Sequence, residues 1–248
     1  MTERLVVVTG GGKGIGRAVV ERFAANGDRV VAVGRDHEAI QATAATCGEA
    51  VRGAICDVTD EAAVAALVDR IGAVDVLVNN AGAAATAPLE RTTLADWQAQ
   101  LAVNATGAFL CTRAVVPGMV ERGSGRIVTV ASTAGRVGSR YTAGYTASKH
   151  AAVGLMRAVA AEVAGTGVTA NAVCPEFVRT DMTRRSVQRI AATTGRSEAE
   201  AEAALVATSP LGRLLEPGEV AFAVTFLAAP EAASINGQTL VLDGGGTR

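Results

Sequence analysis

Tyr145 and Lys149 are the two residues whose types and spacing most directly suggest chemistry. Residues four positions apart lie on one face of a helix, so their polar ends can meet. A nearby ammonium favours the phenolate and lowers the pKa of a phenol, and a tyrosine tuned in this way can exchange a proton with a carbonyl or alcohol oxygen. Such pairs also occur on solvated helix faces. Only Lys13 and Lys149 among the 23 basic residues are lysines, however, which favours a specific use of the second one.

A glycine-rich turn near the N-terminus has the setting of a dinucleotide site. The apolar run at residues 5–8 is typical of a strand buried in a parallel sheet, and residues 17–25 have helical spacing. Glycines between a strand and a helix let the backbone approach a pyrophosphate, which the helix N-terminus attracts. The spacing is one residue longer than the usual fingerprint. The predicted cofactor contacts in this turn are Gly10, Gly12, Lys13, Gly14, Ile15 and Gly16.

The end of the second expected strand, residues 29–33, indicates which dinucleotide binds. An acidic residue there would bond the ribose hydroxyls of NAD, whereas an arginine would receive the extra phosphate of NADP. Arg35 follows the strand, and Lys13 can add a second positive charge near the same phosphate. The sequence therefore favours NADP(H), although Asp36 keeps NAD(H) as the alternative.

Two further strands are expected at residues 51–56 and 75–78, with a helix at residues 61–71 between them. Repeated strand–helix units predict a parallel sheet with right-handed crossovers. The residues that follow these strands are candidates for further cofactor contacts, the first two of them with the adenine. They are Asp57, Val58, Asn80 and Gly82.

Four motifs, in their order and spacing, resemble those of the short-chain dehydrogenase/reductase family. They are Thr9-Gly10-x-x-x-Gly14-x-Gly16, Asn79-Asn80-Ala81-Gly82, Ser132 and Tyr145-x-x-x-Lys149, and the resemblance covers essentially the whole chain. Shorter segments around Arg126, Ser132 and Pro175 are most similar to 3-oxoacyl-carrier-protein reductases and aromatic-polyketide ketoreductases. The resemblance implies one α/β domain over residues 1–248, a doubly wound Rossmann-type fold with a seven-stranded parallel sheet and helices on both faces. It also implies a homotetramer built on two long helices.

A long helix is expected at about residues 97–122, and Asn104 and Gly107 within it lower its stability. In the family that the chain resembles, the matching asparagine holds a water that links the catalytic lysine to solvent. A strand at residues 126–131 delivers Ser132 to the sheet edge where ligands bind in open α/β folds. No Gly-x-Ser-x-Gly motif surrounds Ser132, which disfavours a hydrolase nucleophile. The expected catalytic residues are Asn104, Ser132, Tyr145 and Lys149.

The segment after the sixth expected strand, residues 168–173, carries the last predicted cofactor contacts, at Pro175, Val178 and Thr180. Here the sequence departs from the family that it resembles, in which glycine usually follows this proline. Glu176 stands in that place. Its carboxylate could read a polar group of the substrate, or it could turn to solvent.

Residues 181–209 are polar, rich in arginine and helical in pattern, with a break at Gly195. This pattern predicts a substrate lid, which would close over the ligand and exclude water. A last helix at residues 217–229 and a seventh strand at 239–243 complete the fold. Four arginines near the lid could contact an acidic substrate or could form a solvated helix face: Arg179, Arg184, Arg185 and Arg189.

Composition limits the remaining possibilities. A net charge of −1 gives no electrostatic reason to expect nucleic acid or an anionic membrane as partner. The four cysteines match no metal-ligand spacing, so we expect no metal site and reduced thiols in an intracellular protein. No signal-peptide core and no membrane-spanning run are found, which predicts a cytoplasmic location.

Residues and resemblance together predict hydride transfer from NADPH to a ketone. The expected substrate is a β-keto acyl thioester, with or without a carrier protein, or a polyketide-type cyclic ketone. Tyr145 is the expected general acid, Ser132 bonds the same oxygen, and Asn104 supports the proton relay. Lys149 is expected to lower the pKa of the phenol and, by resemblance, to bind the nicotinamide ribose. The alternatives are an NAD-dependent dehydrogenase of a secondary alcohol or hydroxyacyl compound, and a non-catalytic NADP-binding protein, which would need no acid at Tyr145.

Overall fold

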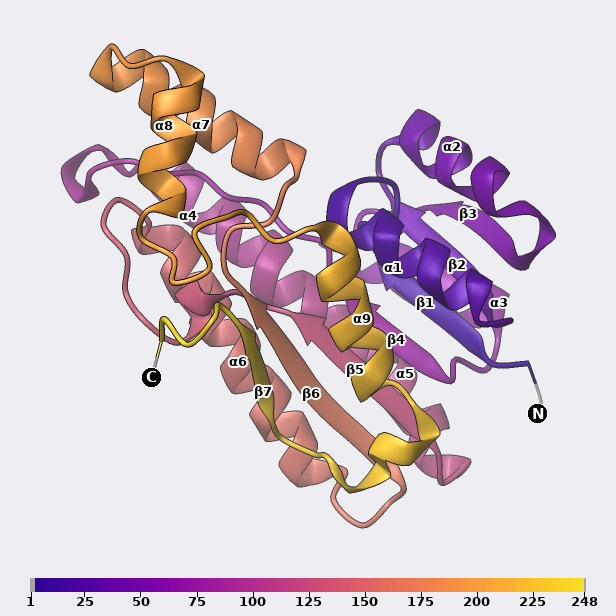
Figure 1. Ribbon diagram of the computed structural model, residues 1–248. Coiled ribbons are helices and arrows are strands. Elements are labelled where there is room, and N and C mark those ends of the chain that lie inside the picture. Colours follow the sequence, from indigo (N-terminus) through magenta and orange to yellow (C-terminus); the bar gives the residue numbers. More distant parts are fainter. Residues whose placement is uncertain (1–2, 248) are drawn as a thin grey trace.

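Seven parallel strands form one sheet in the order β3-β2-β1-β4-β5-β6-β7, in a computed structural model that describes residues 3–247 (Figure 1). Strand β1 (Leu5–Thr9) has the sequence LVVVT and is buried along its whole length, as suits a strand covered on both faces. The parallel seven-stranded sheet predicted from the sequence is confirmed. The other strands are β2 (Arg29–Gly34), β3 (Val51–Ile55), β4 (Val76–Asn79), β5 (Gly125–Val130), β6 (Val168–Pro175) and β7 (Thr239–Leu242).

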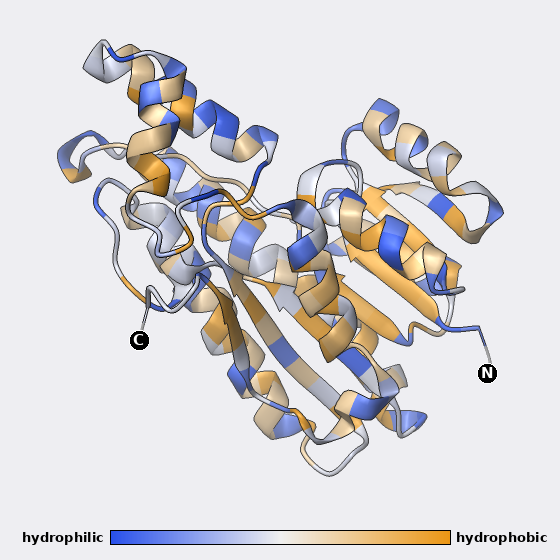
Figure 2. Ribbon diagram, in the orientation of Figure 1, coloured by the Kyte–Doolittle hydropathy of each residue, from blue (hydrophilic) through white to orange (hydrophobic). Residues whose placement is uncertain are grey.

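Helices cover both faces of the sheet and enclose a core on each side (Figure 1). One face carries α1 (Gly14–Ala25), α2 (His37–Cys47) and α9 (Pro217–Leu227). The other carries α3 (Glu61–Ile71), α5 (Gly107–Glu121) and α6 (Ala143–Glu162). Strands β1 and β2 are mostly coloured as hydrophobic in Figure 2, and buried valines are frequent in them, whereas the strands on the β6 side include hydrophilic segments. This arrangement confirms the predicted doubly wound α/β fold. Helix α2 was not among the elements expected from the sequence.

The long helix expected at residues 97–122 has a different internal structure. It consists of α4 (Leu94–Leu101), a π-helical turn (Ala102–Thr106) and α5, which follow one another without a break. Asn104 lies in the π-helical turn. A π-turn inserts an extra residue into a helix and is frequent at functional sites. Asn104 therefore marks a local widening of the helix, and Gly107 is the first residue after it.

Two helices, α7 (Asp181–Thr194) and α8 (Glu198–Val206), project beyond the carboxyl ends of the strands (Figure 1). Thr180 caps the first turn of α7, and Gly195 ends the helix in the left-handed conformation, with φ of 71°. Ser197 and Glu200 form a capping box that starts α8. The helical pattern with a break at Gly195 is thus confirmed, while the function of this segment as a lid stays a prediction.

The strand register brings the carboxyl ends of the central strands to one edge. Val8 of β1 pairs with Val78 of β4, which pairs with Val128 of β5, and Val130 pairs with Val173 of β6. The strand order reverses between β1 and β4, which is where ligands bind in open α/β sheets. The glycine-rich turn and the segments after β4, β5 and β6 therefore meet at this edge.

Within residues 3–247, no helix is long and apolar enough to cross a membrane. The same part of the chain contains no cluster of histidine, cysteine, aspartate and glutamate side chains that could hold a metal ion.

Candidate active site

Helix α6 carries Tyr145 and Lys149 in its first two turns. The Nζ atom of Lys149 lies 5.8 Å from the centroid of the Tyr145 ring. It donates a hydrogen bond of 2.9 Å to the carbonyl oxygen of Val130, the last residue of β5. Lys149 is buried, with 5% of its surface exposed. The structure therefore brings the phenol and the ammonium close together, as their spacing predicts.

Burial shifts the acidity of this pair in a direction that the sequence did not predict. It raises the pKa of Tyr145, because a phenolate loses its hydration, and the neighbouring Ser132 hydroxyl offsets only part of this effect. Burial also lowers the pKa of Lys149 to about 8. Burial thus acts on the phenol in the opposite direction to the lowering expected from Lys149, and the effect of the ammonium itself stays a prediction.

Ser132 follows β5 and lies beside the phenol of Tyr145. Its Oγ atom accepts a hydrogen bond of 3.1 Å from the amide of Ala134, within a short turn at Thr133–Gly135. Gly135 is required in that turn because a Cβ there would come within 2.9 Å of the Lys149 carbonyl oxygen. The turn after β5 thus lies close to helix α6, and the side chains of Ser132 and Tyr145 are neighbours.

Asn104 is buried, with 3% of its surface exposed, and its side-chain amide holds the peptide groups of Ala83. The Nδ2 atom donates to the Ala83 carbonyl oxygen at 2.8 Å, and the Oδ1 atom accepts from the Ala83 amide at 2.9 Å. Nδ2 also donates to the hydroxyl of Ser148 at 2.8 Å, which in turn donates to the carbonyl oxygen of Tyr145 at 2.8 Å. Ser148 was missed in the sequence analysis, because nothing in the sequence around a helical serine identifies its distant partner Asn104.

Gly82 marks the place where Asn104 and Lys149 approach one another. A Cβ at this position would lie 3.0 Å from the Oδ1 atom of Asn104 and 3.7 Å from the Nζ atom of Lys149. The structure therefore gathers the four predicted catalytic residues at the carboxyl edge of β4 and β5, from three separate segments of the chain.

The glycine-rich turn after β1 needs glycine for two separate reasons. Gly10 and Gly14 have φ of 67° and 52°, in the left-handed region that disfavours side chains. At Gly16, a Cβ would overlap the carbonyl oxygen of Gly10. The side-chain amide of Asn80 secures the turn by donating to the carbonyl oxygens of Thr9 and Gly10, at 2.9 and 3.2 Å. Asn80 therefore supports the turn from the neighbouring strand.

Thr9 also supports the glycine-rich turn, although the sequence analysis assigned it no function. Its buried hydroxyl accepts hydrogen bonds from the amides of Asn80 and Ala81, at 2.9 and 3.0 Å. It also lies 3.3 Å from the carbonyl oxygen of Val78, to which it donates. Thr9 thus joins the ends of β1 and β4, where the strand order reverses. Its position at the head of the glycine motif was the signal that could have found it.

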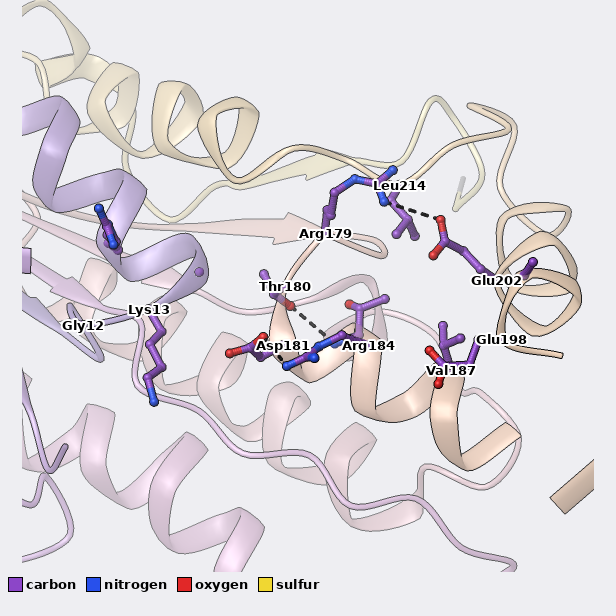
Figure 3. Close-up of a pocket in the computed structure, with 14 residues that line it drawn as sticks. Gly12, Lys13, Arg179, Thr180, Asp181, Arg184, Val187, Glu198, Glu202 and Leu214 are labelled. Atoms are coloured by element: carbon purple, nitrogen blue, oxygen red, sulfur yellow. Dashed lines mark hydrogen bonds and ion pairs between the residues drawn. The ribbon is translucent and has the colours of Figure 1, made fainter. Parts of the chain in front are cut away.

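The N-terminus of α1 is suited to an anion. No side chain caps it and no acidic residue lies in its first turn, whereas Asp, Thr or Ser side chains cap α2, α3, α4, α7 and α8. A cleft of about 560 Å³ opens beside this turn and is lined by Gly12, Lys13, Gly14 and Thr180 together with residues of α7 and α8 (Figure 3). Tyr145 does not line this cleft. These residues fit the pyrophosphate of a dinucleotide, at some remove from the reaction centre.

Lys13 and Arg35 lie where a phosphate on the adenosine ribose is expected, but each is paired with a carboxylate. Lys13 Nζ lies 2.6 Å from Asp36, and Arg35 Nη1 lies 3.3 Å from Asp57. The hydrogen bond between Lys13 and Asp36 raises the pKa of the lysine and lowers that of the carboxyl. Both pairs are exposed, and exposed ion pairs contribute little, so an incoming phosphate can replace the carboxylates.

The predicted cofactor contacts in the segment after β6 differ in how they could reach the dinucleotide. Thr180 packs against the glycine turn, since a Cβ at Gly14 would lie 3.0 Å from its Cγ2 atom. Pro175 ends β6 and is buried. Val178 is buried in the core, as is Val58 after β3, so cofactor contacts at these two positions would come from the main chain. Ile15 likewise packs against the core from the start of α1.

Three of the four arginines near the predicted lid already bind groups of the chain. Arg179 pairs with Glu216 at 2.9 Å and with Glu202 at 3.5 Å. Arg184 pairs with Asp181 at 3.0 Å, and Arg189 donates to the carbonyl oxygen of Thr86 at 2.6 Å. These contacts favour a structural role for the three side chains over the substrate contact considered from the sequence.

Known proteins match this chain along its length. The family model described as short chain dehydrogenase matches residues 4–191. The chain is 39% identical to D-threitol dehydrogenase of Mycolicibacterium smegmatis, over 98% of this chain and 93% of that protein. It is 37% identical to 3-oxoacyl-acyl-carrier-protein reductase FabG of Vibrio cholerae, over 98% and 96%. A solved structure of an actinorhodin polyketide ketoreductase variant with NADPH has a TM-score of 0.92 and 39% identity, over 98% and 97%.

These matches agree with the motifs and with the edge of the sheet where the motifs meet. The glycine-rich turn, the residues after β4, Ser132 and the tyrosine–lysine pair all lie within the part matched by the family model. The chain therefore belongs to the short-chain dehydrogenase family, and it is an oxidoreductase that acts on carbonyl or alcohol groups.

Proposed function

We propose that this protein is an NADPH-dependent ketoreductase. The observation that carries the proposal is the convergence of Tyr145, Ser132 and Lys149 at the sheet edge that also bears the glycine-rich turn. An acid, a hydrogen-bond donor and a cation next to a dinucleotide turn are the groups that carbonyl reduction requires.

Tyr145 is the proposed general acid, giving its proton to the substrate carbonyl oxygen. Burial raises its pKa, so the phenol is protonated at neutral pH, which is the form that donates. Ser132, beside the same phenol, donates a hydrogen bond to the carbonyl oxygen and stabilises the charge that develops there. The bound nicotinamide supplies the hydride.

Lys149 and Asn104 complete the proposed site. Lys149 is fixed to β5 through the Val130 carbonyl oxygen and presents its ammonium to the space that the nicotinamide ribose would enter. Asn104 lies next to Lys149 across Gly82, at the start of the path by which a proton would return to Tyr145 from solvent. Both residues are buried, so neither side chain needs to be ordered when the substrate binds.

The cofactor preference rests on the residues after β1 and β2. Lys13 and Arg35 would bind the 2′-phosphate of NADPH once it replaces Asp36 and Asp57 as their partner. A similar ketoreductase was solved with NADPH, which supports this choice. The pyrophosphate would be held by the amides of the turn at the uncapped start of α1.

For the substrate, we propose a β-keto acyl thioester or a polyketide-type cyclic ketone. Two similar proteins are named for such reactions, the 3-oxoacyl-acyl-carrier-protein reductase and the actinorhodin polyketide ketoreductase.

Apolar side chains of α5, such as Phe109 and Val120, are exposed and are available to the homotetramer that family resemblance implies. Light scattering coupled to size exclusion would measure that state.

One observation favours a second candidate, an NAD-dependent dehydrogenase of a secondary alcohol. Asp36 follows β2 by two residues and caps α2, near the place where a carboxylate would bond the ribose hydroxyls of NAD. One similar protein is named D-threitol dehydrogenase, which acts on an alcohol. A binder without catalysis is disfavoured, because it would not need Tyr145 beside Ser132.

The experiment is steady-state reduction of acetoacetyl thioester and trans-1-decalone, with NADPH and NADH compared side by side. We expect a strong preference for NADPH and a loss of about a hundredfold to ten-thousandfold in kcat for Tyr145→Phe, as for other general acids. Tyr141→Phe is the matched control, because it removes the only other tyrosine hydroxyl, which is exposed. Faster turnover with NADH, or full activity of Tyr145→Phe, would contradict the proposal.

A further inference from the structure

Arg189 makes a side-chain hydrogen bond that joins helix α7 to the loop after β4. Its Nη1 atom donates to the carbonyl oxygen of Thr86 at 2.6 Å and reaches the Thr86 hydroxyl at 3.4 Å. The other described side-chain hydrogen bonds of residues 181–206 stay within these helices or reach nearby residues of the same region. Arg189 alone among them reaches a segment about a hundred positions away in the sequence.

Thr86 lies in the loop after β4, and hydrogen bonds hold this loop at three points, one of them at the predicted catalytic residue Asn104. The main chain of Ala83 is bound at both polar groups by the Asn104 side chain. The amide of Ala85 donates to the Gln100 side chain at 3.0 Å. The amide of Ala87 donates to the carbonyl oxygen of Tyr141 at 2.9 Å, just before α6. A shift of Thr86 is therefore transmitted to both sides of the loop.

The hydrogen bonds continue from this loop to the proposed acid. Asn104 donates to Ser148, and Ser148 donates to the carbonyl oxygen of Tyr145. The series from Arg189 through Thr86, the loop, Asn104 and Ser148 thus ends at the backbone of the tyrosine. Each of its links inside the molecule is between 2.8 and 2.9 Å, and Asn104 and Ser148 are buried. Buried, well-formed bonds of this kind hold a fixed geometry.

The first link differs from the others because Arg189 is exposed. Water competes for both partners of this exposed hydrogen bond, so it exchanges more readily than the buried ones, although a charged donor makes it strong enough to hold a loop. It can therefore break and form again without disturbing the core. The exposed contact lies at one end and the buried network at the other. This combination suits a residue that links the position of α7 and α8, the predicted lid, to the buried network.

We propose that Arg189 is a positioning residue that couples closure of α7 and α8 to the geometry of Asn104 and Tyr145. The inference rests on the proposed reductase function and on the predicted lid at residues 181–209. With Arg189 bound to Thr86, the loop after β4 is held against Asn104, and the acid is aligned. When α7 moves away, the loop gains freedom, and Asn104 loses part of its support on the substrate side.

The test compares Arg189→Ala, Arg189→Lys and the control Arg196→Ala, in the full-length protein with its cofactor and ketone. Arg196 is an exposed cation in the connection between α7 and α8, so its loss alters the charge of the same region equally. We expect Arg189→Ala to lower kcat by about tenfold, with the KM for cofactor unchanged and partial recovery in Arg189→Lys, because loss of alignment acts on the chemical step. Arg196→Ala should stay within about twofold of the wild type.

A second measurement excludes a general loss of structure. Amide hydrogen exchange of residues 82–88 should accelerate in Arg189→Ala and not in Arg196→Ala, while exchange in α6 beyond its first turn stays unchanged. Equal kcat and equal loop exchange in the two variants would overturn the coupling, as would an effect on substrate KM alone. The proposed function itself would fail differently, by absence of ketone reduction in the wild type.

Discussion

The Nζ atom of Lys149 lies 5.8 Å from the centre of the Tyr145 ring, yet its hydrogen bond goes to the carbonyl oxygen of Val130 at 2.9 Å. The ammonium is thus anchored to β5 while the phenol belongs to α6. Burial of this space raises the pKa of Tyr145 and lowers that of Lys149 to about 8. At neutral pH the phenol is therefore protonated, and the lysine is the member of the pair that titrates first as the pH rises.

The pH dependence of ketone reduction follows from this order. We expect kcat/KM to fall as the pH rises through about 8, because the cation that orders the site is lost there. The Tyr145 proton should be lost only at higher pH, since its pKa is raised. The measurement is kcat/KM for trans-1-decalone across the alkaline range. In Lys149→Arg, which cannot lose its charge, this alkaline decrease should disappear at a lower overall rate. A decrease that persists unchanged would assign it to another group.

The same lysine predicts a pH-dependent stability. Its pKa is lowered from 10.5 to about 8 on folding, so the unfolded chain binds more protons between these values, and folding stability rises with pH there. A shift of this size corresponds to about 3 kcal/mol. The free energy of unfolding of the wild type, measured by urea titration relative to Lys149→Met, should increase by up to this amount, about 3 kcal/mol, from about pH 7 to about pH 10.5. A constant difference would show that the ammonium is not desolvated.

Cofactor choice is predicted to depend on the pair formed by Lys13 and Asp36. Replacing Asp36 by Asn removes the negative charge beside the expected phosphate but keeps a side chain that can cap α2, as Asp36 does through the amide of Ala39. We expect the KM for NADPH to fall by about threefold to tenfold and the KM for NADH to rise, as the removal of one exposed charge suggests.

The control for this change is Asp60→Asn. Asp60 caps α3 in the same way, through the amide of Ala63 at 3.0 Å, but it is not paired with Lys13. Its replacement should leave the ratio of the two KM values unchanged. An equal response of both variants would mean that the cap, and not the charge, governs cofactor binding.

The sequence predicted the elements whose signals are local. The apolar run at residues 5–8 and the glycines after it identify a buried strand and a turn, because a strand covered on both faces excludes polar residues. The four-residue spacing of Tyr145 and Lys149 depends only on helix geometry, and the structure keeps both on α6. Likewise, Gly195 ends α7 in the left-handed conformation that glycine favours.

Features that depend on distant neighbours were not predictable. Tyr145 is half-buried, and its raised pKa results from burial by segments that lie far from it in the sequence, so the residues around it do not predict the shift. The pairing of Arg35 with Asp57 joins the ends of two strands. The π-helical turn around Asn104 was hidden because the apolar periodicity continues on both sides of it. Ser148 acquires its role only through Asn104, which lies 44 positions away.

Substitutions of Glu176, which stands where the family usually has glycine, test whether this residue affects the choice of substrate. The residue is half-buried after β6, and its amide donates to the carbonyl oxygen of Leu242 at 3.0 Å. A carboxylate at the substrate end of the site would repel an anionic substrate. We expect Glu176→Gln and Glu176→Gly to lower the KM for acetoacetyl-coenzyme A by about threefold, with little change for neutral trans-1-decalone. Unchanged kinetics on both substrates would mean that the carboxylate faces solvent.

Gly16 provides the sharpest test of the turn that holds the cofactor. A Cβ there would overlap the carbonyl oxygen of Gly10, which Asn80 also binds, so the turn must open to accept it. We expect Gly16→Ala to lower the free energy of unfolding by about 1–3 kcal/mol, as for other overpacked sites, and to abolish saturation with dinucleotide. Gly154→Ala is the matched control: Gly154 lies inside α6, and open space surrounds its would-be Cβ. That change should instead stabilise the protein by about 0.5–1 kcal/mol, because alanine favours the helix. Thermal unfolding with and without NADPH separates the two effects, and equal responses of the two variants would show that the turn tolerates a side chain.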